Sequence, residues 1–348
     1  MTDAPAAPDS VAAPPLLAVE SVDVTLGRGW RANQVLSGVD LDVWPGEIVG
    51  LVGETGSGKT TLARTVVGLV HPRRGRILFE GLPISALRRG ALRAQRRRGY
   101  VQLVFQDPLR SLDPDLTVAE IVAEGLRIRG ETDRGEIRQR VTSALEKVGL
   151  DATVLERTPG QISGGQRQRV SIARALAVEP RLLICDEPVS ALDASTRNYV
   201  LRLLEELRTS LGLAIVIISH DLSSLAGIAD RIVVLYRGRI VEDGPVDRVF
   251  ATPRHPYTAL LMASAPSVQH DRPFSPQQLR RSGSDPALQP GPGGCVFAVR
   301  CPFAAEVCAT QPALATIGER WSVACHRHEE WSELAQTAIR QEGPAHAR

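Results

Sequence analysis

The stretch EIVGLVGETGSGKT, residues 47–60, decides the fold of this chain. Its first half is a short apolar run that predicts a buried strand. Its second half fits the pattern G-x-x-x-x-G-K-[ST], in which glycines let backbone N–H groups turn inward around phosphate oxygens. Lys59 can then reach the β- and γ-phosphates, and the Thr60 hydroxyl can bind Mg²⁺. The sequence thus predicts a nucleotide site formed by Gly53, Glu54, Thr55, Gly56, Ser57, Gly58, Lys59, Thr60 and the neighbouring Thr61.

A helix is expected to begin near Lys59, because Leu62, Val66 and Leu69 recur at helical spacing. The N-terminus of this helix would add partial positive charge close to the phosphates. Strand, loop and helix in this order are the local context that a phosphate-binding loop requires.

Further apolar runs at residues 182–185, 213–218 and 232–236 have the length of core strands. Between the first strand and these runs, residues 116–150 show the 3.6-residue apolar period of helices. Strands that alternate with helices predict an α/β fold with a largely parallel sheet. The helical stretch is expected to form an inserted lobe over about residues 107–178.

The composition argues against several classes of function. The 348 residues carry a net charge of +2, which gives no electrostatic argument for a nucleic-acid partner. No stretch approaches the roughly 18–20 apolar residues that span a bilayer. Residues 1–16 are rich in Ala and Pro, so they are expected to be disordered, and they lack the pattern of a secretory signal. The chain is therefore expected to stay in the cytoplasm, with other polypeptides supplying any membrane path.

A second apolar strand ends in two carboxylates in LLICDE, residues 182–187. Asp186 at the strand end is placed to hold Mg²⁺, directly or through water. Glu187 beside it can accept a proton from an attacking water. An apolar run that ends in Asp-Glu is weak evidence alone, and the phosphate-binding loop gives it weight.

The segment ISGGQ, residues 162–166, opens a predicted helix that runs to about Ala177. Ser163 suits a helix cap, and Gly164 and Gly165 expose backbone N–H groups. An ordinary capped helix is one interpretation, and a second anion-binding helix start that meets a γ-phosphate is the other. Because one nucleotide cannot easily use both phosphate sites of a single chain, the second interpretation suggests a dimer with ATP held between the protomers.

Two polar residues near strand ends complete the set. A lone His is usually a satisfied surface or core residue, but His220 follows a core strand, where it can contact a γ-phosphate. Gln106, in VFQDP at residues 104–108, is a loop amide that could contact Mg²⁺ or the attacking water.

The order of the phosphate-binding loop, Gln106, ISGGQ, LLICDEP, SALD and SHD resembles the ABC-transporter ATPase family over residues 17–254. This resemblance implies a P-loop NTPase core of the ABC type with an inserted helical lobe, ATP and Mg²⁺ as ligands, and ATP hydrolysis. Glu187 would be the general base and His220 the γ-phosphate switch. A soluble ABC ATPase that never meets a membrane is the competing class, but such proteins commonly carry tandem units or a long coiled-coil insertion.

The same resemblance assigns residues to the dimer and to adenine. Ser163, Gly164, Gly165 and Gln166 would form the signature that closes over the partner's ATP, and Asp193 in SALD would connect the two sites. The aromatic residue that commonly stacks on adenine is not obvious. Trp30 is the candidate, and an exposed loop aromatic is the alternative.

A narrower resemblance involves FQDP with SLDP, PRHPYT at residues 253–258, and the ending GCVFAVRCPFAAEVC with VACH. These segments are similar to the ATPases of oligopeptide/dipeptide importers, and DEPVSALD with ISHDLSSL resembles the second of their two paralogous ATPases. The resemblance implies a C-terminal extension over residues 255–329, followed by a tail at 330–348. Nickel importers share the extension, so the solute stays open.

The implied partners are a second ATPase subunit (a copy or a paralogue), two membrane permeases and an extracytoplasmic solute-binding protein that acts through the permeases. The chain would then lie on the cytoplasmic face of the cell membrane as a peripheral protein.

Four of the five cysteines lie close together: Cys295, Cys301, Cys308 and Cys325. Their C-x5-C-x6-C-x16-C spacing lacks the close pairs of structural zinc sites and is not that of ferredoxins. Four nearby thiolates still suit a tetrahedral metal or a [4Fe–4S] cluster, and similar family extensions are associated with such a cluster. The alternative is that the thiols stay reduced and pack a small, loop-rich lobe.

Overall fold

The computed structural model describes residues 14–27, 29–190, 192–264, 274–281 and 293–342. Its centre is an eight-stranded sheet in the order β11-β12-β10-β9-β3-β8-β7-β6, accompanied by a smaller four-stranded sheet. The strands of the large sheet are β3 (Ile48–Val52), β6 (Val101–Val104), β7 (Leu182–Asp186), β8 (Ala214–Ser219), β9 (Arg231–Tyr236), β10 (Arg239–Pro245), β11 (Ala315–Gly318) and β12 (Trp321–Val323).

The middle of this sheet is parallel, as the sequence predicts. β3 pairs in parallel with β8 and β9, and β7 pairs in parallel with β8 and β6. Every residue of β3, β7, β8 and β9 is buried, which explains why their sequences are continuous apolar runs rather than alternating ones. The carboxyl ends of these strands therefore meet at one edge of the sheet, where the predicted site residues lie.

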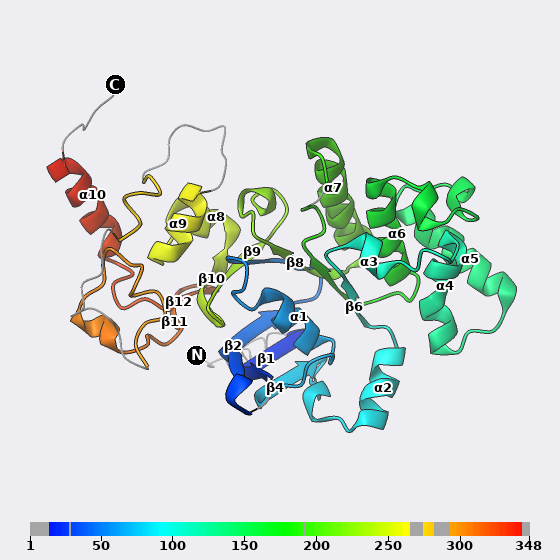
Figure 1. The fold of residues 1–348 in the computed structure, drawn as a ribbon, viewed down its shortest axis with the longest axis horizontal. Coiled ribbons are helices and arrows are strands. Elements are labelled where there is room, and N and C mark those ends of the chain that lie inside the picture. The colour runs from blue at the N-terminus through cyan, green and yellow to red at the C-terminus, as the bar shows by residue number, and fades with distance from the viewer. Residues whose placement is uncertain (1–13, 28, 191, 265–273, 282–292, 343–348) are drawn as a thin grey trace, which may run out of the picture.

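The smaller sheet is antiparallel and consists of β1 (Leu17–Leu26), β2 (Asn33–Val43), β4 (Arg74–Phe79) and β5 (Leu82–Pro83). β1 alternates between buried and less buried residues, in agreement with its alternating sequence. The buried face packs with β3 and with α1 (Lys59–Val66) in one apolar cluster. The phosphate-binding loop, residues 53–60, thus lies between two sheets (Figure 1).

The helix after this loop is shorter than its apolar spacing predicts. α1 ends at Val66, whereas Leu69 lies beyond it and is 47% exposed. The reason is Gly68, whose φ of 74° is a left-handed conformation that ends helices. The expectation that Leu69 shares the buried face of the helix was therefore wrong.

Helices between β6 and β7 gather on one side of the molecule, as expected for the inserted lobe (Figure 1). The helical stretch at residues 116–150 is two helices rather than one, because Gly130 caps the first in the left-handed conformation with φ 102°. The helices in this region are α3 (Pro108–Ser111), α4 (Val118–Arg129), α5 (Arg134–Lys147) and α6 (Gly164–Leu176), while α2 (Arg89–Arg97) precedes β6 and α7 (Ala194–Leu211) follows β7.

The C-terminal part is joined to the main sheet rather than forming a lobe with its own core. β12 pairs with β10, with Glu242 opposite Val323. Buried side chains such as Phe297 and Trp331 belong to the same apolar cluster as β3 and β8. The helices here are α8 (Val246–Ala251), α9 (Pro256–Ser264) and α10 (Trp331–Glu342).

Near both ends of the chain, the described residues pack against the rest of the protein, and the helix expected beyond residue 330 is α10. Residues 1–13 lie outside the described residues, but Leu16 is 4% exposed and its carbonyl accepts a hydrogen bond from the Glu80 amide at 2.8 Å. At the other end, the Trp331 indole donates to the carbonyl of Arg254 at 2.9 Å. Ordered chain therefore begins before residue 17 and continues past 330. Within the described ranges, none of the helices combines the length and the apolar character needed to cross a membrane.

Candidate active site

Three glycines shape the phosphate-binding loop between β3 and α1. Gly53, Gly56 and Gly58 have φ values of 154°, 83° and 112°, which L side chains rarely adopt. A Cβ atom on Gly53 would also lie 2.1 Å from the carbonyl oxygen of Leu235. Glycine is therefore required here both for backbone conformation and for the close approach of β9.

The Lys59 side chain lies inside the loop that precedes it. Its Nζ donates to the carbonyl oxygen of Gly53 at 2.6 Å and to that of Glu54 at 3.0 Å, and the residue is 6% exposed. Burial lowers the pKa of Lys59, while the carboxylates of Glu187 and Asp186 oppose this effect. The loop thus already surrounds one ammonium group, which matches the chemistry of a phosphate site.

Asp186 ends β7 next to the start of α1. Its carboxyl group accepts a hydrogen bond from the Thr60 side chain, and burial raises its pKa. The other carboxyl oxygen, Oδ1, and the hydroxyl of Ser57 are buried without a hydrogen-bond partner among the described residues. Buried oxygens of this kind normally have partners, so Asp186 Oδ1 near Thr60 fits a site for Mg²⁺, and the Ser57 hydroxyl within the loop fits a contact to phosphate.

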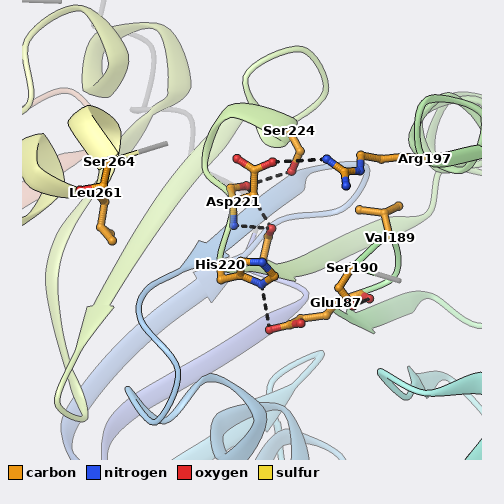
Figure 2. Close-up of a pocket in the computed structure, with 10 residues that line it drawn as sticks. Glu187, Val189, Ser190, Arg197, His220, Asp221, Ser224, Leu261 and Ser264 are labelled. Carbon is orange, nitrogen blue, oxygen red and sulfur yellow. Dashed lines mark hydrogen bonds and ion pairs between the residues drawn. The ribbon is translucent and has the colours of Figure 1, made fainter. Parts of the chain in front are cut away.

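Glu187, Gln106 and His220 are brought into direct contact. The Gln106 Nε2 donates to Glu187 Oε2 at 2.7 Å, and His220 Nδ1 lies 3.3 Å from Glu187 Oε1. Figure 2 shows His220 pointing toward the Glu187 carboxylate. The three residues come from the ends of β6, β7 and β8, which are adjacent and parallel. Topology therefore explains how residues 81 positions apart, such as Gln106 and Glu187, meet at one point.

The backbone of Glu187 is also unusual. Its φ is 50°, in the left-handed region, and its amide donates to the carbonyl of Ile218 on β8 at 3.0 Å. Such a conformation is uncommon for a residue with a side chain and is concentrated at functional sites. The carboxylate is 14% exposed, whereas His220 is 55% exposed.

A cavity of about 350 Å³ opens beside this carboxylate. Figure 2 shows that Glu187 and His220 line one part of it and that Leu261 and Ser264 of α9 line another. Arg197 and Asp221 form an ion pair with an N–O distance of 3.8 Å in its wall. Water in this cavity can therefore reach Glu187, the candidate general base.

The signature segment begins a helix as predicted. Ser163 Oγ accepts from the Gln166 amide at 3.2 Å, and Gln166 Oε1 accepts from the Ser163 amide at 2.9 Å, which is a capping box. Ser163 and Gly164 are exposed, and a Cβ on Gly164 would meet nothing within 4 Å. A Cβ on Gly165 would instead lie 2.6 Å from Cγ2 of Thr196 on α7. The N-terminus of α6 is thus open at its tip and packed against α7 just behind it.

Asp193 has a local structural partner. It caps α7 by accepting from the amides of Ser195 and Thr196 at 3.1 and 3.0 Å. Hydrogen bonds from Ser195 and Thr196 lower the pKa of Asp193. The capping role is visible within one chain, and the expected role across a dimer stays a prediction.

Glu54 and Trp30, two of the predicted nucleotide contacts, have different outcomes. The Glu54 amide donates to Tyr257 Oη and its carboxylate binds Arg300, so these two groups face the C-terminal extension (residues 255–329), and only the Glu54 carbonyl contacts Lys59 inside the loop. Trp30 lies in a 3-10 turn at Gly29–Arg31, but its side chain is outside the described residues. Adenine stacking by Trp30 therefore stays a prediction.

The structure gives no sign of a metal site at the four cysteines of the extension. All are free thiols, and the described residues contain no group of three or more His, Cys, Asp or Glu side chains that could hold a metal ion. The expected iron–sulfur cluster thus finds no support in this structure.

Sequence reasoning did not predict that Tyr257 and Arg300 contact the phosphate-binding loop. Tyr257 stood in PRHPYT, which identified a family without suggesting a chemical role. Arg300 lies 246 residues from Glu54 in sequence, and nothing local to either residue indicates that they pair.

Comparison with family models agrees with this geometry. Residues 36–190 match the model described as ABC transporter, and residues 241–308 match the model described as oligopeptide/dipeptide transporter, C-terminal region. A Brucella ovis protein with a provisional name as a peptide import ATP-binding protein is 44% identical over 85% of this chain and 92% of its own length. The oligopeptide transport ATP-binding protein OppF of Escherichia coli is 42% identical over 86% of this chain and 91% of its own length.

Solved structures show the same fold. A dimeric ATP-binding cassette with bound ADP and phosphate is 31% identical, covers 66% of this chain and 98% of its own, and has a TM-score of 0.61. A cassette protein of the Clostridium perfringens ABC transporter complex cbiONQ is 32% identical, covers 68% of this chain and 91% of its own, and has the same TM-score. The chain belongs to the ATP-binding proteins of ABC transporters, which are ATPases that use ATP and Mg²⁺, and within them to the group with the oligopeptide/dipeptide C-terminal region.

Proposed function

We propose that this chain binds ATP at residues 53–60 and hydrolyses it with Glu187 as the general base, and that hydrolysis drives peptide import. The observation that carries the proposal is the Glu187 carboxylate, which is held on one side by Gln106 at 2.7 Å and on the other by His220 at 3.3 Å. A carboxylate fixed at both oxygens next to a phosphate-binding loop is oriented for proton transfer.

The loop residues bind and neutralise the phosphates. Lys59 exchanges its carbonyl partners in the loop for phosphate oxygens, and the α1 N-terminus adds partial positive charge. Thr60 and Asp186 would hold Mg²⁺, which neutralises charge on the β- and γ-phosphates when bound. Asp186 Oδ1 would supply a further oxygen ligand to the metal ion, and the Ser57 hydroxyl would supply a hydrogen bond within the loop.

The strand-end residues act on the attacking water. Glu187 takes its proton while Gln106 orients the carboxylate or the water. His220, at the opposite carboxylate oxygen, can donate to a γ-phosphate, because half of its side chain is exposed toward the cavity. Burial of Glu187 to 14% exposure limits competition from bulk water.

Each complete ATP site would need a second subunit. The open N-terminus of α6 at Ser163 and Gly164 is suited to contact phosphate that another protomer holds. A relative has been solved as a dimer with ADP and phosphate, which supports this arrangement. The partner would be a copy of this chain or a paralogue.

The transported solute is inferred from relatives. Proteins named as peptide import and oligopeptide transport ATP-binding proteins share more than 40% of their residues with this chain over most of both lengths. The chain would therefore lie on the cytoplasmic face of the membrane, beneath two permeases fed by an extracytoplasmic solute-binding protein. We expect the chain to act as the second of the two paralogous ATPases of such an importer.

Reconstitution tests this proposal. The chain, its partner ATPase and two permeases are assembled in liposomes, and ATP hydrolysis is measured with and without a peptide-loaded binding protein. We expect peptide to stimulate hydrolysis, and we expect Lys59→Ala to abolish the stimulated rate. Stimulation by nickel or another small solute, with none by peptides, would move the assignment to a different importer of the same family.

A further inference from the structure

A bidentate ion pair joins the C-terminal extension to the phosphate-binding loop. Arg300 Nη1 and Nη2 each lie 2.8 Å from one oxygen of Glu54, the second residue of the loop. Arg300 lies between Cys295 and Cys301, in a described segment that contributes no strand to either sheet. Two parallel N–H···O bonds fix the relative orientation of the two groups as well as their distance.

A second contact holds the same loop residue from the same side. The Glu54 amide donates to Tyr257 Oη at 2.9 Å, and Tyr257 lies on α9. Tyr257 is fully buried and packs against the rings of Tyr236 and Phe297, with centroids 4.4 and 5.5 Å apart. Burial raises the pKa of the Tyr257 hydroxyl, so it stays protonated.

The third polar group of Glu54, its backbone carbonyl, contacts the phosphate-binding loop itself. Its carbonyl oxygen accepts from Lys59 Nζ at 3.0 Å. The amide, the carboxylate and the carbonyl of one residue are therefore bonded to Tyr257, Arg300 and Lys59 respectively. Glu54 thus connects the extension to Lys59, the residue that would bind the β- and γ-phosphates.

The extension is itself firmly anchored. Arg300 lies over the rings of Tyr236 and Phe297, at 5.7 and 5.9 Å from their centroids, and Tyr236 ends β9 beside the loop strand β3. β12 continues the main sheet through β10. Hydrogen bonding to Arg300 holds the pKa of Glu54 below its usual range, so the pair stays charged near neutral pH.

We propose that Arg300 and Tyr257 are positioning residues for the phosphate-binding loop and that the C-terminal extension thereby sets the affinity of the chain for ATP. The proposal rests on the function proposed above, in that residues 53–60 bind ATP. A loop that is already held in its bound shape loses less conformational freedom when ATP binds, so its affinity is higher. The extension acts on binding and leaves Glu187, Gln106 and His220 unchanged.

Equilibrium binding of a fluorescent ATP analogue to the full chain tests this, without Mg²⁺ so that no hydrolysis occurs. Arg300→Ala and Glu54→Ala should each raise the Kd about two- to five-fold, the range of a partly exposed ion pair. The double variant should be no weaker than either single one, because both remove the same interaction. Tyr257→Phe, which keeps the ring and removes only the hydroxyl, should also raise the Kd.

Further variants separate positioning from general stability. Arg300→Lys should recover part of the affinity, since an ammonium keeps the charge but not the paired bonds. Arg76→Ala breaks a similar Arg–Glu pair with Glu20 on the small sheet and should leave the Kd unchanged. ATPase assays with Mg²⁺ should show a raised KM with kcat retained.

Two results would overturn the proposal: an Arg300→Ala protein with wild-type Kd, or additive effects in the double variant. A lower melting temperature with unchanged Kd would likewise reduce the pair to a structural contact. If instead the wild-type chain fails to bind ATP, or Lys59→Ala binds as tightly as wild type, the proposed function itself fails.

Discussion

Gln106 Nε2 donates a hydrogen bond to Glu187 Oε2 at 2.7 Å, and this bond connects the helical region to the chemistry of the site. Gln106 follows β6, and α3 begins two residues later at Pro108. The residue that hydrogen-bonds to the candidate base therefore lies directly before the first helix of the α3–α6 region.

Replacement of Glu187 by Gln keeps the size and hydrogen-bonding capacity of the side chain but removes its basicity. We expect hydrolysis to fall at least about 100-fold, the typical contribution of a positioned base, with ATP binding retained. Single-turnover assays and a separate binding measurement check both parts. Glu205→Gln, an exposed carboxylate on α7, is the matched control and should hydrolyse normally. Near wild-type turnover in Glu187→Gln would remove this residue as the base.

Replacement of Gln106 by Ala leaves Glu187 with His220 as its remaining side-chain contact in the described structure. Because the lost bond involves a charged acceptor at an exposed position, we expect kcat to fall about three- to ten-fold with the KM for ATP unchanged. Gln102→Ala on β6, whose amide bonds only the Gly99 carbonyl at 3.2 Å, is the control. A rise in KM with kcat retained would show that Gln106 binds nucleotide instead of orienting the base.

Much of the core could be predicted because its signals are local. β3, β7, β8 and β9 are buried on both faces, so their sequences are short, continuous apolar runs that stand out. The addition of β12 to β10 was not predictable, since Glu242 and Val323 are about 80 residues apart and neither strand is strongly apolar. The early end of α1 was missed because the left-handed Gly68 outweighs the apolar period that includes Leu69.

At the site, too, local motifs could be predicted, whereas contacts between residues far apart in the sequence could not. Gln106, Glu187 and His220 were predicted separately, and parallel pairing of neighbouring strands brings them together at one sheet edge. The position of Glu54 was not foreseen. A loop motif shows which residues can surround phosphate, but it carries no information on a side chain that faces a segment 246 residues away.

Gly165, the second glycine of the signature segment, packs too closely against α7 to accept a larger residue. A Cβ on Gly165 would lie 2.6 Å from Cγ2 of Thr196, so Gly165→Ala should lower the free energy of unfolding by about 1–3 kcal/mol through overpacking. Gly164→Ala has open space and should be neutral or slightly stabilising. Urea unfolding of both variants provides the comparison.

A compensating change sharpens this test. Thr196→Ser removes the obstructing Cγ2 but keeps the hydroxyl that donates to Asp193 Oδ2 at 2.8 Å. The double variant Gly165→Ala with Thr196→Ser should therefore regain most of the lost stability. Equal destabilisation with and without Thr196→Ser would locate the effect of Gly165 elsewhere, for example in the backbone of α6.

His255 should make the fold sensitive to mild acid. It is completely buried, and burial lowers its pKa from 6.5 to about 3. Its Nδ1 accepts from the Tyr257 amide at 3.0 Å, so the neutral ring is the form that starts α9. Below pH 6.5 the unfolded chain binds a proton that the folded chain does not, and the free energy of unfolding therefore falls as the pH falls. At pH 5 this loss amounts to about 2 kcal/mol relative to neutral pH.

Substitution of His255 by Asn isolates this effect, because an Asn oxygen can accept the same Tyr257 amide bond but does not titrate. The buried Glu242 accepts a hydrogen bond from the backbone amide of residue 255, which both proteins keep, so its titration affects them alike. Urea unfolding at pH 5 and pH 7.5 should show a smaller difference in unfolding free energy for His255→Asn, by about 2 kcal/mol. The absolute stability of the variant can be lower, because a smaller side chain leaves space in the core. An unchanged pH dependence would mean that His255 is protonated in the folded protein or that another group controls its acid sensitivity.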